Sequence, residues 1–188
     1  MATRAREIEQ AFLANIQSET SKNLDDWMTY LAATELSKTK ALIAHLKAEF
    51  PLNHRQASML AGIYLNDGQP VYDYDVLFKK LFDGKAAMQA LYEDVAQIVA
   101  EKLPDTVELI PTKTYVSIEA ERVFACAKIN KTNLRVGVDL DREFDDYVVV
   151  AKGLGAMPNI SHMVEIKSVD DIDDRLADVL LEAYHNRH

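Results

Sequence analysis

The spacing between apolar residues changes once along this chain, and that change constrains the fold more than any other feature. As far as residue 103, apolar residues recur every three or four positions, as in Ile8, Phe12 and Ile16, which is the spacing of one helix face. The period then falls to two in segments rich in β-branched and aromatic residues: 113–118, 122–129, 134–140, 147–150 and 162–167. A helical period returns after residue 170. Helices followed by a run of strands predict an α+β protein.

The helices before residue 65 are predicted to form a separate small domain. They are amphipathic and too short to be stable alone, so we expect them to pack together around Phe12 and Trp27. Asn53 followed by Gln56 is a capping-box pattern that predicts a helix start. From residue 66 to 74 the sequence Asn-Asp-Gly-Gln-Pro-Val-Tyr-Asp-Tyr has no apolar period. We therefore predict a helical domain over 1–66, a linker over 67–75 and an α+β domain over 76–188.

The strands of the second domain are predicted to form a mainly antiparallel sheet covered on one face by two helices. One helix spans 85–103 and ends at Pro104, and the other follows residue 170. Alternation along the strands separates apolar residues, which should face the helices, from a mixed set on the other face. The apolar set is Thr114, Val116, Ile118, Val123, Ala125, Ala127, Ile129, Leu134, Val136, Val138 and Leu140.

The face opposite the helices supplies the candidate site. It is predicted to carry Lys113, Tyr115, Ser117, Arg122, Phe124, Cys126, Lys128, Arg135 and Asp139. Aromatic rings mixed with cationic side chains on an uncovered sheet can stack on planar groups and pair with their charges. The candidate ligand-binding residues are Lys113, Tyr115, Arg122, Phe124, Lys128 and Arg135. The structural alternative is a solvated face whose long cationic side chains lie over aromatic rings, or a face covered by the helical domain.

Composition limits the partners and the compartment. Lysine and arginine number 21 against 30 aspartates and glutamates, a net charge of −9, which disfavours non-specific attraction to nucleic acid or to anionic lipid. Any nucleic-acid site would have to be local. The single cysteine, Cys126, lies in an apolar run and is interpreted as a small buried hydrophobe. The charged N-terminal residues do not resemble a signal peptide and no apolar stretch is long enough for a membrane span, so we expect a cytoplasmic protein without a membrane partner.

Motifs for catalysis or cofactor binding are not found in the sequence. It contains no Walker-type loop, no His-Glu-x-x-His, no Cys-x-x-Cys and no Gly-x-Ser-x-Gly. Gly153-Leu154-Gly155 is interpreted as a turn, and the aspartates from Asp170 to Asp174 as the start of a helix, where the helix dipole favours acids. We therefore predict no catalytic residues, no metal site and no cofactor. The absence of these motifs favours a non-enzyme over an enzyme.

Two stretches resemble known families. The segment from Asn15 to Leu65, with Ser-Lys-Asn-Leu-Asp-Asp-Trp at 21–27 and later His-Leu-Lys at 45–47, resembles the bacterial family called domain of unknown function 4287. From about residue 77 to 184, Lys-Thr-Tyr-Val-Ser at 113–117, Arg-Val-Phe-Ala at 122–125 and Val-Asp-Asp-Ile-Asp at 169–173 resemble domain of unknown function 5655. The resemblance implies the fold and the order of the two domains, and neither family brings an activity with it.

Two hypotheses for function follow. The first is a non-catalytic binding or adaptor module that uses the uncovered sheet face for an anionic or planar partner, such as a nucleotide, a single-stranded nucleic acid or a protein. The alternative is an enzyme of unrecognised type with its pocket between the domains, near Trp27, Tyr115 and His162. A shallow basic face favours the binder, whereas a closed pocket that holds a histidine or carboxylate beside a nucleophile favours the enzyme.

Overall fold

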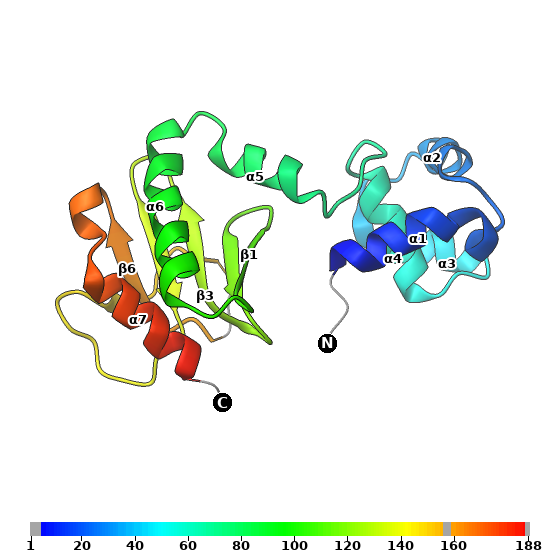
Figure 1. Ribbon diagram of the computed structural model, residues 1–188. Helices are drawn as coiled ribbons and strands as arrows, with labels where there is room; N and C mark the ends of the chain where they lie inside the picture. The colour runs from blue at the N-terminus through cyan, green and yellow to red at the C-terminus, as the bar shows by residue number, and fades with distance from the viewer. Residues whose placement is uncertain (1–4, 156–158, 187–188) are drawn as a thin grey trace. The chain divides into compact units, whose positions relative to one another are not determined.

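The computed structural model describes residues 5–155 and 159–186. The chain forms two compact units, Met1–Asp73 and Tyr74–His188 (Figure 1). Each unit has an apolar core of its own. The predicted fold class is confirmed, because a helical segment is followed by an antiparallel sheet with helices on one face.

The first unit is built from short helices packed around Trp27, whose side chain is fully buried. The Asn53 side chain accepts the backbone N–H of Gln56 while the Gln56 side chain accepts that of Asn53, so the predicted capping box is confirmed. The Trp27 indole donates to Thr20 Oγ1 at 2.8 Å, which satisfies its only polar atom inside the core. The helices are α1 (Ala5–Thr20), α2 (Leu24–Ala32), α3 (Thr39–Glu49) and α4 (His54–Tyr64).

A buried carboxylate holds the end of the first unit. Glu9 of α1 is only 2% exposed, and its two oxygens accept the backbone N–H groups of Val71 and Tyr72 at 2.8 and 2.9 Å. Two charge-assisted hydrogen bonds compensate for the burial of this charge. Residues 67–73, predicted as linker, are therefore attached to the first unit, and the boundary between the units falls after Asp73.

In the part of the second unit that the structure describes, six strands form one sheet in which all neighbouring strands are antiparallel, in the order β1-β2-β3-β4-β6-β5. Two helices precede the sheet, α5 (Tyr74–Phe82) and α6 (Ala86–Lys102), and the 3-10 turn η1 (Val169–Asp171) and α7 (Asp174–His185) follow it. The strands are β1 (Glu108–Pro111), β2 (Val116–Glu119), β3 (Val123–Ile129), β4 (Leu134–Val138), β5 (Val149–Val150) and β6 (His162–Ile166).

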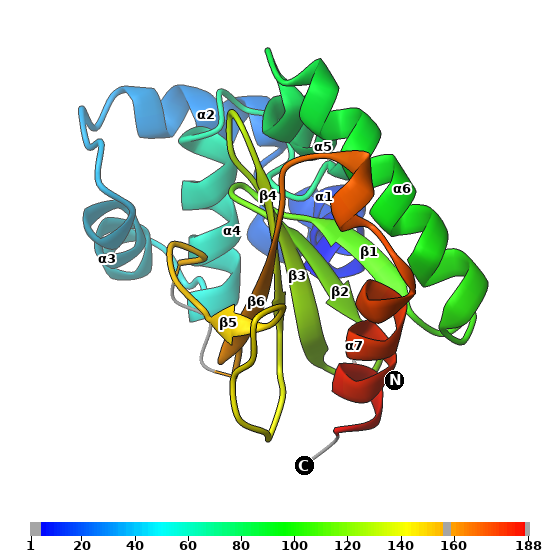
Figure 2. The same ribbon diagram turned by 90° about the vertical axis from the view of Figure 1, so that its left-hand side faces the viewer.

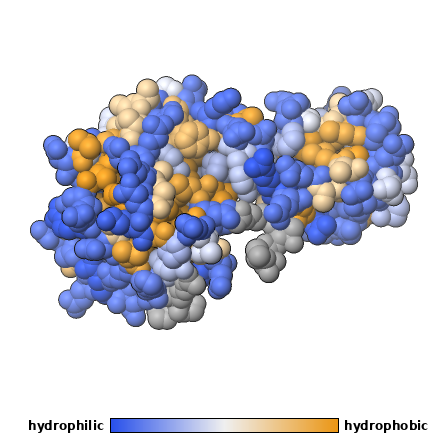
Figure 3. All heavy atoms as spheres, in the orientation of Figure 1, coloured by the Kyte–Doolittle hydropathy of each residue, from blue (hydrophilic) through white to orange (hydrophobic). Residues whose placement is uncertain are grey.

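Helices α6 and α7 lie together on one side of the sheet (Figure 2). Leu91, Val95 and Val99 of α6 and Leu176 and Leu180 of α7 pack on the apolar side chains of the central strands, forming the core of this unit. In Figure 3 the outer surface of α6 is mainly hydrophilic, with hydrophobic residues on either side of it, as expected of an amphipathic helix. Because these helices cover one face of the sheet, a ligand-binding site on the sheet would have to lie on the opposite face.

Three details of the predicted strands are wrong. Strand β1 was not predicted, although it pairs with β2 along its whole length. Residues Lys113 to Tyr115 form the β1–β2 turn instead of starting a strand, and Thr112 Oγ1 accepts the backbone N–H of Tyr115 there at 3.1 Å. The strand predicted from residue 147 begins only at Val149.

Candidate functional site on the uncovered sheet face

One row of side chains crosses the sheet face that the helices leave uncovered. The β3–β4 register pairs Lys128 with Arg135, and the β4–β6 register pairs Arg135 with Glu165. Because Val116 pairs with Ala127, continuing that register places Tyr115 beside Lys128. Tyr115, Lys128, Arg135 and Glu165, here called the charged row, therefore lie side by side. Three of the six predicted ligand-binding residues are brought together in it.

Arg135 is held firmly within the charged row. Its guanidinium forms an ion pair with Glu165 at 3.5 Å and donates to the backbone carbonyl of Lys152 at 3.1 Å. Gly153 passes so close that an added Cβ would lie 2.3 Å from Arg135 Nη1, and its φ of +67° also suits glycine. The arginine therefore joins the sheet to the segment that follows β5.

Glu165 is the acidic member of the charged row and has several cationic or polar neighbours. Lys167 Nζ lies 2.9 Å from one carboxylate oxygen, and Asn133 Nδ2 donates to the other at 2.6 Å. The hydrogen bond from Lys167, with the charges of Lys167 and Arg135, lowers the pKa of Glu165 below its usual value. Glu165 is thus an ionised counter-charge for Arg135 and Lys167.

Lys128 differs from these neighbours because it makes no ion pair with any residue that the structure describes. It is half-buried between Arg135 on one side and Tyr115 on the other. Burial raises the pKa of the Tyr115 phenol, so the ring stays neutral. Lys113, another of the predicted residues, is exposed in the turn before Tyr115. A cation next to an aromatic ring is available here to an anionic group.

Part of this face is covered by the chain itself. Cys126, Leu154 and Met163 form a small buried cluster beside the charged row, with Tyr115, Ala151 and Ile160 against it. Gly137 permits the contact, since a Cβ there would lie 2.5 Å from Leu154 and 2.9 Å from Cys126 Sγ. Burial raises the pKa of the Cys126 thiol to about 11, which agrees with its predicted structural role.

Phe124 and Arg122 do not lie where alternation placed them. The β2–β3 register shifts so that Ile118 pairs with Ala125 but Glu119 pairs with Val123, which leaves Phe124 as the extra residue of a β-bulge. Phe124 is consequently 2% exposed on the helix side, with its ring 5.6 Å from that of Tyr184. Val123, predicted to be in the core, is 36% exposed for the same reason.

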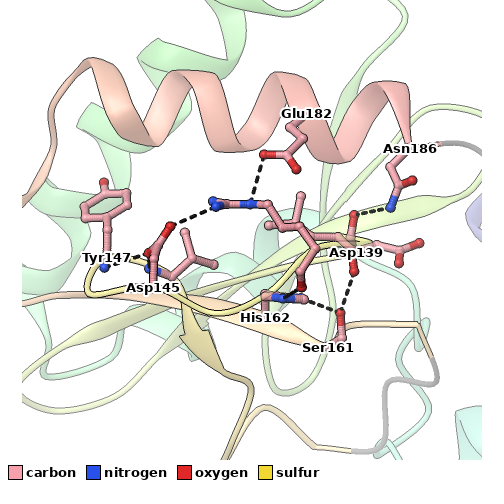
Figure 4. Close-up of polar contacts among 10 residues, drawn as sticks. Asp139, Asp145, Tyr147, Ser161, His162, Glu182 and Asn186 are labelled. Atoms are coloured by element: carbon pink, nitrogen blue, oxygen red, sulfur yellow. Dashed lines mark hydrogen bonds and ion pairs between the residues drawn. The ribbon is translucent and has the colours of Figure 1, made fainter.

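Arg122 forms structural contacts at the C-terminal end of α7. Its guanidinium lies 3.0 Å from the Asp139 carboxylate and donates to the backbone carbonyl of Asn186 at 2.7 Å. Asn186 in turn donates to the backbone carbonyl of Asp139 at 3.2 Å (Figure 4). The helix dipole stabilises a cation at a helix C-terminus. Through its contacts with Asp139 and Asn186, Arg122 connects the start of β3 to the end of β4 and to the end of α7.

His162, named in the enzyme hypothesis, is the buried member of a polar cluster whose other side chains are partly or fully exposed (Figure 4). It is 3% exposed, with Nδ1 2.6 Å from Ser161 Oγ and Nε2 2.9 Å from the backbone carbonyl of Arg142. The Arg142 side chain lies between Asp145 and Glu182, at 2.8 and 3.2 Å. These contacts fix the segment after β4 against α7. Because the Trp27 side chain is also fully buried, neither residue presents a reactive surface.

A groove at the β5–β6 edge was not predicted from the sequence. Its volume is about 360 Å³, and it is lined by Arg135, Asp146, Tyr147, Val149, Lys152, Met163, Val164, Glu165, Asp171 and Arg175. The Arg175 guanidinium lies 4.2 Å from the centre of the Tyr147 ring and is paired with Asp173 at 2.8 Å. The groove adjoins the charged row, because Arg135 and Glu165 belong to both.

The described residues, 5–155 and 159–186, show neither a metal site nor a membrane span. In these ranges no group of three or more His, Cys, Asp or Glu side chains is arranged to hold a metal ion. No helix in the same ranges is long and apolar enough to cross a membrane.

The fold and the charged row define a two-unit α+β protein with a mixed cationic and aromatic surface on its sheet. The chain belongs to the family described as Domain of unknown function (DUF5655), which matches residues 78–187. Residues 9–66 match a second family, described as Domain of unknown function (DUF4287). The predicted resemblance and the order of the two families are thereby confirmed. No curated protein and no solved structure matches this chain.

Proposed function

We propose that the second unit is a non-catalytic binding module that takes an anionic group of its partner, a phosphate or a carboxylate, at the charged row. The observation that carries the proposal is Lys128, a half-buried cation without a counter-ion among the described residues, held between Arg135 and the Tyr115 ring. A bound anion would supply the missing charge. Exposed Lys113 lies in the turn before Tyr115, and exposed Lys152 lies in the segment whose carbonyl contacts Arg135, so both add positive potential near the row.

The geometry of the face favours binding over catalysis. Arg135 is immobilised by Glu165 and by the Lys152 carbonyl, so it is preorganised to orient a ligand. The Cys126 thiol is protonated, and His162 uses both ring nitrogens in contacts within its own unit. The protein carries a net charge of −9, which directs the proposal to a local site instead of an extended nucleic-acid track.

The test is a charge reversal at the centre of the row. The Lys128→Glu variant should bind a fluorescein-labelled oligothymidylate and a labelled acidic peptide at least several-fold more weakly than wild type at low salt, with little change in stability. Lys102→Glu, an exposed site on the helix side of the sheet, is the matched control. If wild type binds neither probe at low ionic strength, or if both variants behave alike, the proposal is wrong.

A further inference from the structure

The outer edge of β6 is only partly paired. Strand β5 is two residues long and pairs Val149 with Met163 and Val150 with His162. The backbone N–H of Ala151 donates to the carbonyl of Ser161 at 2.9 Å, which identifies the hydrogen-bonded positions of this ladder. Since these positions alternate, the N–H and C=O groups of Met163, Glu165 and Lys167 also point away from β4.

Along the described part of this edge, the backbone N–H and C=O groups of Glu165 are the ones that no neighbouring strand pairs. Met163 faces Val149, and the Lys167 N–H donates to Asp171 Oδ2 at 2.8 Å. Continuing the β5–β6 register would place Tyr147 opposite Glu165, but the Tyr147 N–H donates to Asp145 Oδ1 at 2.8 Å instead. Within residues 5–155 and 159–186 the Glu165 N–H and C=O therefore have no partner across this edge.

The groove described above lies along this gap. Tyr147 and Val149 line it on the β5 side, and Val164 and Glu165 of β6 line it on the other. Its volume of about 360 Å³ is within the range of ligand pockets, roughly 300–1,000 Å³. A donor and an acceptor side by side on a strand edge, with space beside them, suit the backbone of another extended chain.

Charge indicates which extended chain fits. Arg135 is paired with Glu165, and Arg175 with Asp173. The exposed side chain of Lys152 makes no ion pair with any residue in the described ranges, and it lies on the groove wall. An acidic side chain of the partner would pair with it. Asp146 on the β5 side of the groove is likewise unpaired in those ranges and disfavours a uniformly acidic chain.

We infer that the groove binds an extended peptide segment that pairs with the Glu165 backbone and directs one acidic side chain to Lys152. This inference rests on the proposed function, because Arg135 and Glu165 belong to both surfaces, and it names the partner as a peptide. The bound segment continues the sheet beyond the point where β5 turns away. Backbone hydrogen bonds provide the attachment, and the lysine selects the acid.

The experiment uses amide exchange on isotope-labelled full-length protein. The probe is a blocked peptide of roughly seven residues, threonine and valine with one central glutamate, which at about 3.3 Å per residue spans the groove. Binding should slow exchange of the Glu165 amide at least tenfold and leave solvent-exposed amides of the β3–β4 turn unchanged. An N-methylated version of the peptide, which lacks the backbone donors, should give no protection.

Charge is tested from both sides of the contact. Replacing the peptide glutamate by glutamine, or Lys152→Glu in the protein, should each weaken binding about fivefold or more at low salt, whereas Lys102→Glu should not. The peptide change needs no folded variant, so a misfolded protein cannot obscure the result. If the N-methylated peptide binds as well as the parent, or the Glu165 amide gains no protection, strand pairing is refuted.

The outcome also separates the two proposals. If the oligothymidylate binds in a manner that depends on Lys128 while the peptide does not bind, anion binding stands and the peptide inference is wrong. If neither probe binds, the proposed function fails as well.

Discussion

Arg122→Ala removes contacts that the structure assigns to stability and not to ligand binding. The guanidinium pairs with Asp139 at 3.0 Å, with side chains 30% and 15% exposed, and donates to the Asn186 carbonyl at 2.7 Å. Removing one partner of this partly buried ion pair should cost more than the loss of an exposed pair, about 0–1 kcal/mol, and less than the loss of one partner of a fully buried pair, about 3–5 kcal/mol. A hydrogen bond to a charged group contributes about 1.5–3 kcal/mol. We expect a loss of about 2 kcal/mol.

Urea unfolding with two probes tests this value. The only tryptophan, Trp27, lies in the core of the first unit, so its fluorescence reports that unit, whereas circular dichroism reports both. With a slope of about 2 kcal/mol per molar urea, the variant should lower the midpoint of the second unit by about 1 M. The Trp27 midpoint should stay unchanged if the units unfold separately, as the predicted domain division implies.

Two results would refute this reasoning. An unchanged circular dichroism transition would show that Arg122 is not a structural residue, and it would return to the list of candidate ligand contacts. Equal shifts of both probes would show that the units unfold together. Lys128→Ala is the control, since a half-exposed side chain without an ion pair should change stability by no more than about 0.5 kcal/mol.

Further predictions concern single groups. Gly137→Ala should cost about 1–3 kcal/mol, measured by urea unfolding, because the new methyl group would overlap Leu154. Glu9→Gln should lower the Trp27 fluorescence midpoint, because one oxygen acceptor is lost. A thiol reagent should modify Cys126 only in denaturant, since burial raises its pKa to about 11. Hydrogen bonds from Val148, Arg142 and Tyr147 lower the pKa of Asp145 from 3.8 to about 2. The contribution of the ionised Asp145 carboxylate to stability should therefore be present above about pH 4 and disappear as the pH falls toward about 2. A carboxyl NMR titration measures the pKa, and Asp145→Asn should remove this pH dependence of stability.

The fold class could be predicted because the burial of one face of each helix or strand sets the spacing of apolar residues along the sequence. The stripe Met88, Leu91, Val95 and Val99 is helical in spacing and is buried against the sheet as expected. The capping box at Asn53 is local in sequence, so it too could be recognised in advance. Strand β1 was missed because it has only four residues and ends at Pro111, which is tolerated because β1 is an edge strand.

The candidate site was only half predictable, because alternation carries information only while the register is unbroken. From Ala125 to Arg135 the register holds, and Lys128 and Arg135 lie on the predicted face. Before Ala125 the bulge adds one residue, which turns Phe124 to the helices and brings Arg122 to the end of α7. A one-residue shift reverses the face of every earlier side chain, and a bulge without glycine leaves no clear mark in sequence.

The groove exists because the Asp145 side chain competes with strand β6 for backbone N–H groups, and the alternation of apolar residues does not reveal this competition. The run Tyr147 to Val150 has strand composition, and it was predicted as a strand throughout. Asp145 instead accepts the N–H groups of Tyr147 and Val148 at 2.8 and 2.6 Å, which removes the donor that would have paired with β6. Short aspartate side chains favour such turns over ladder hydrogen bonds. The contact that delays the start of β5 until Val149 thus leaves the Glu165 edge open, so the proposed groove and the turn at Asp145 have one cause.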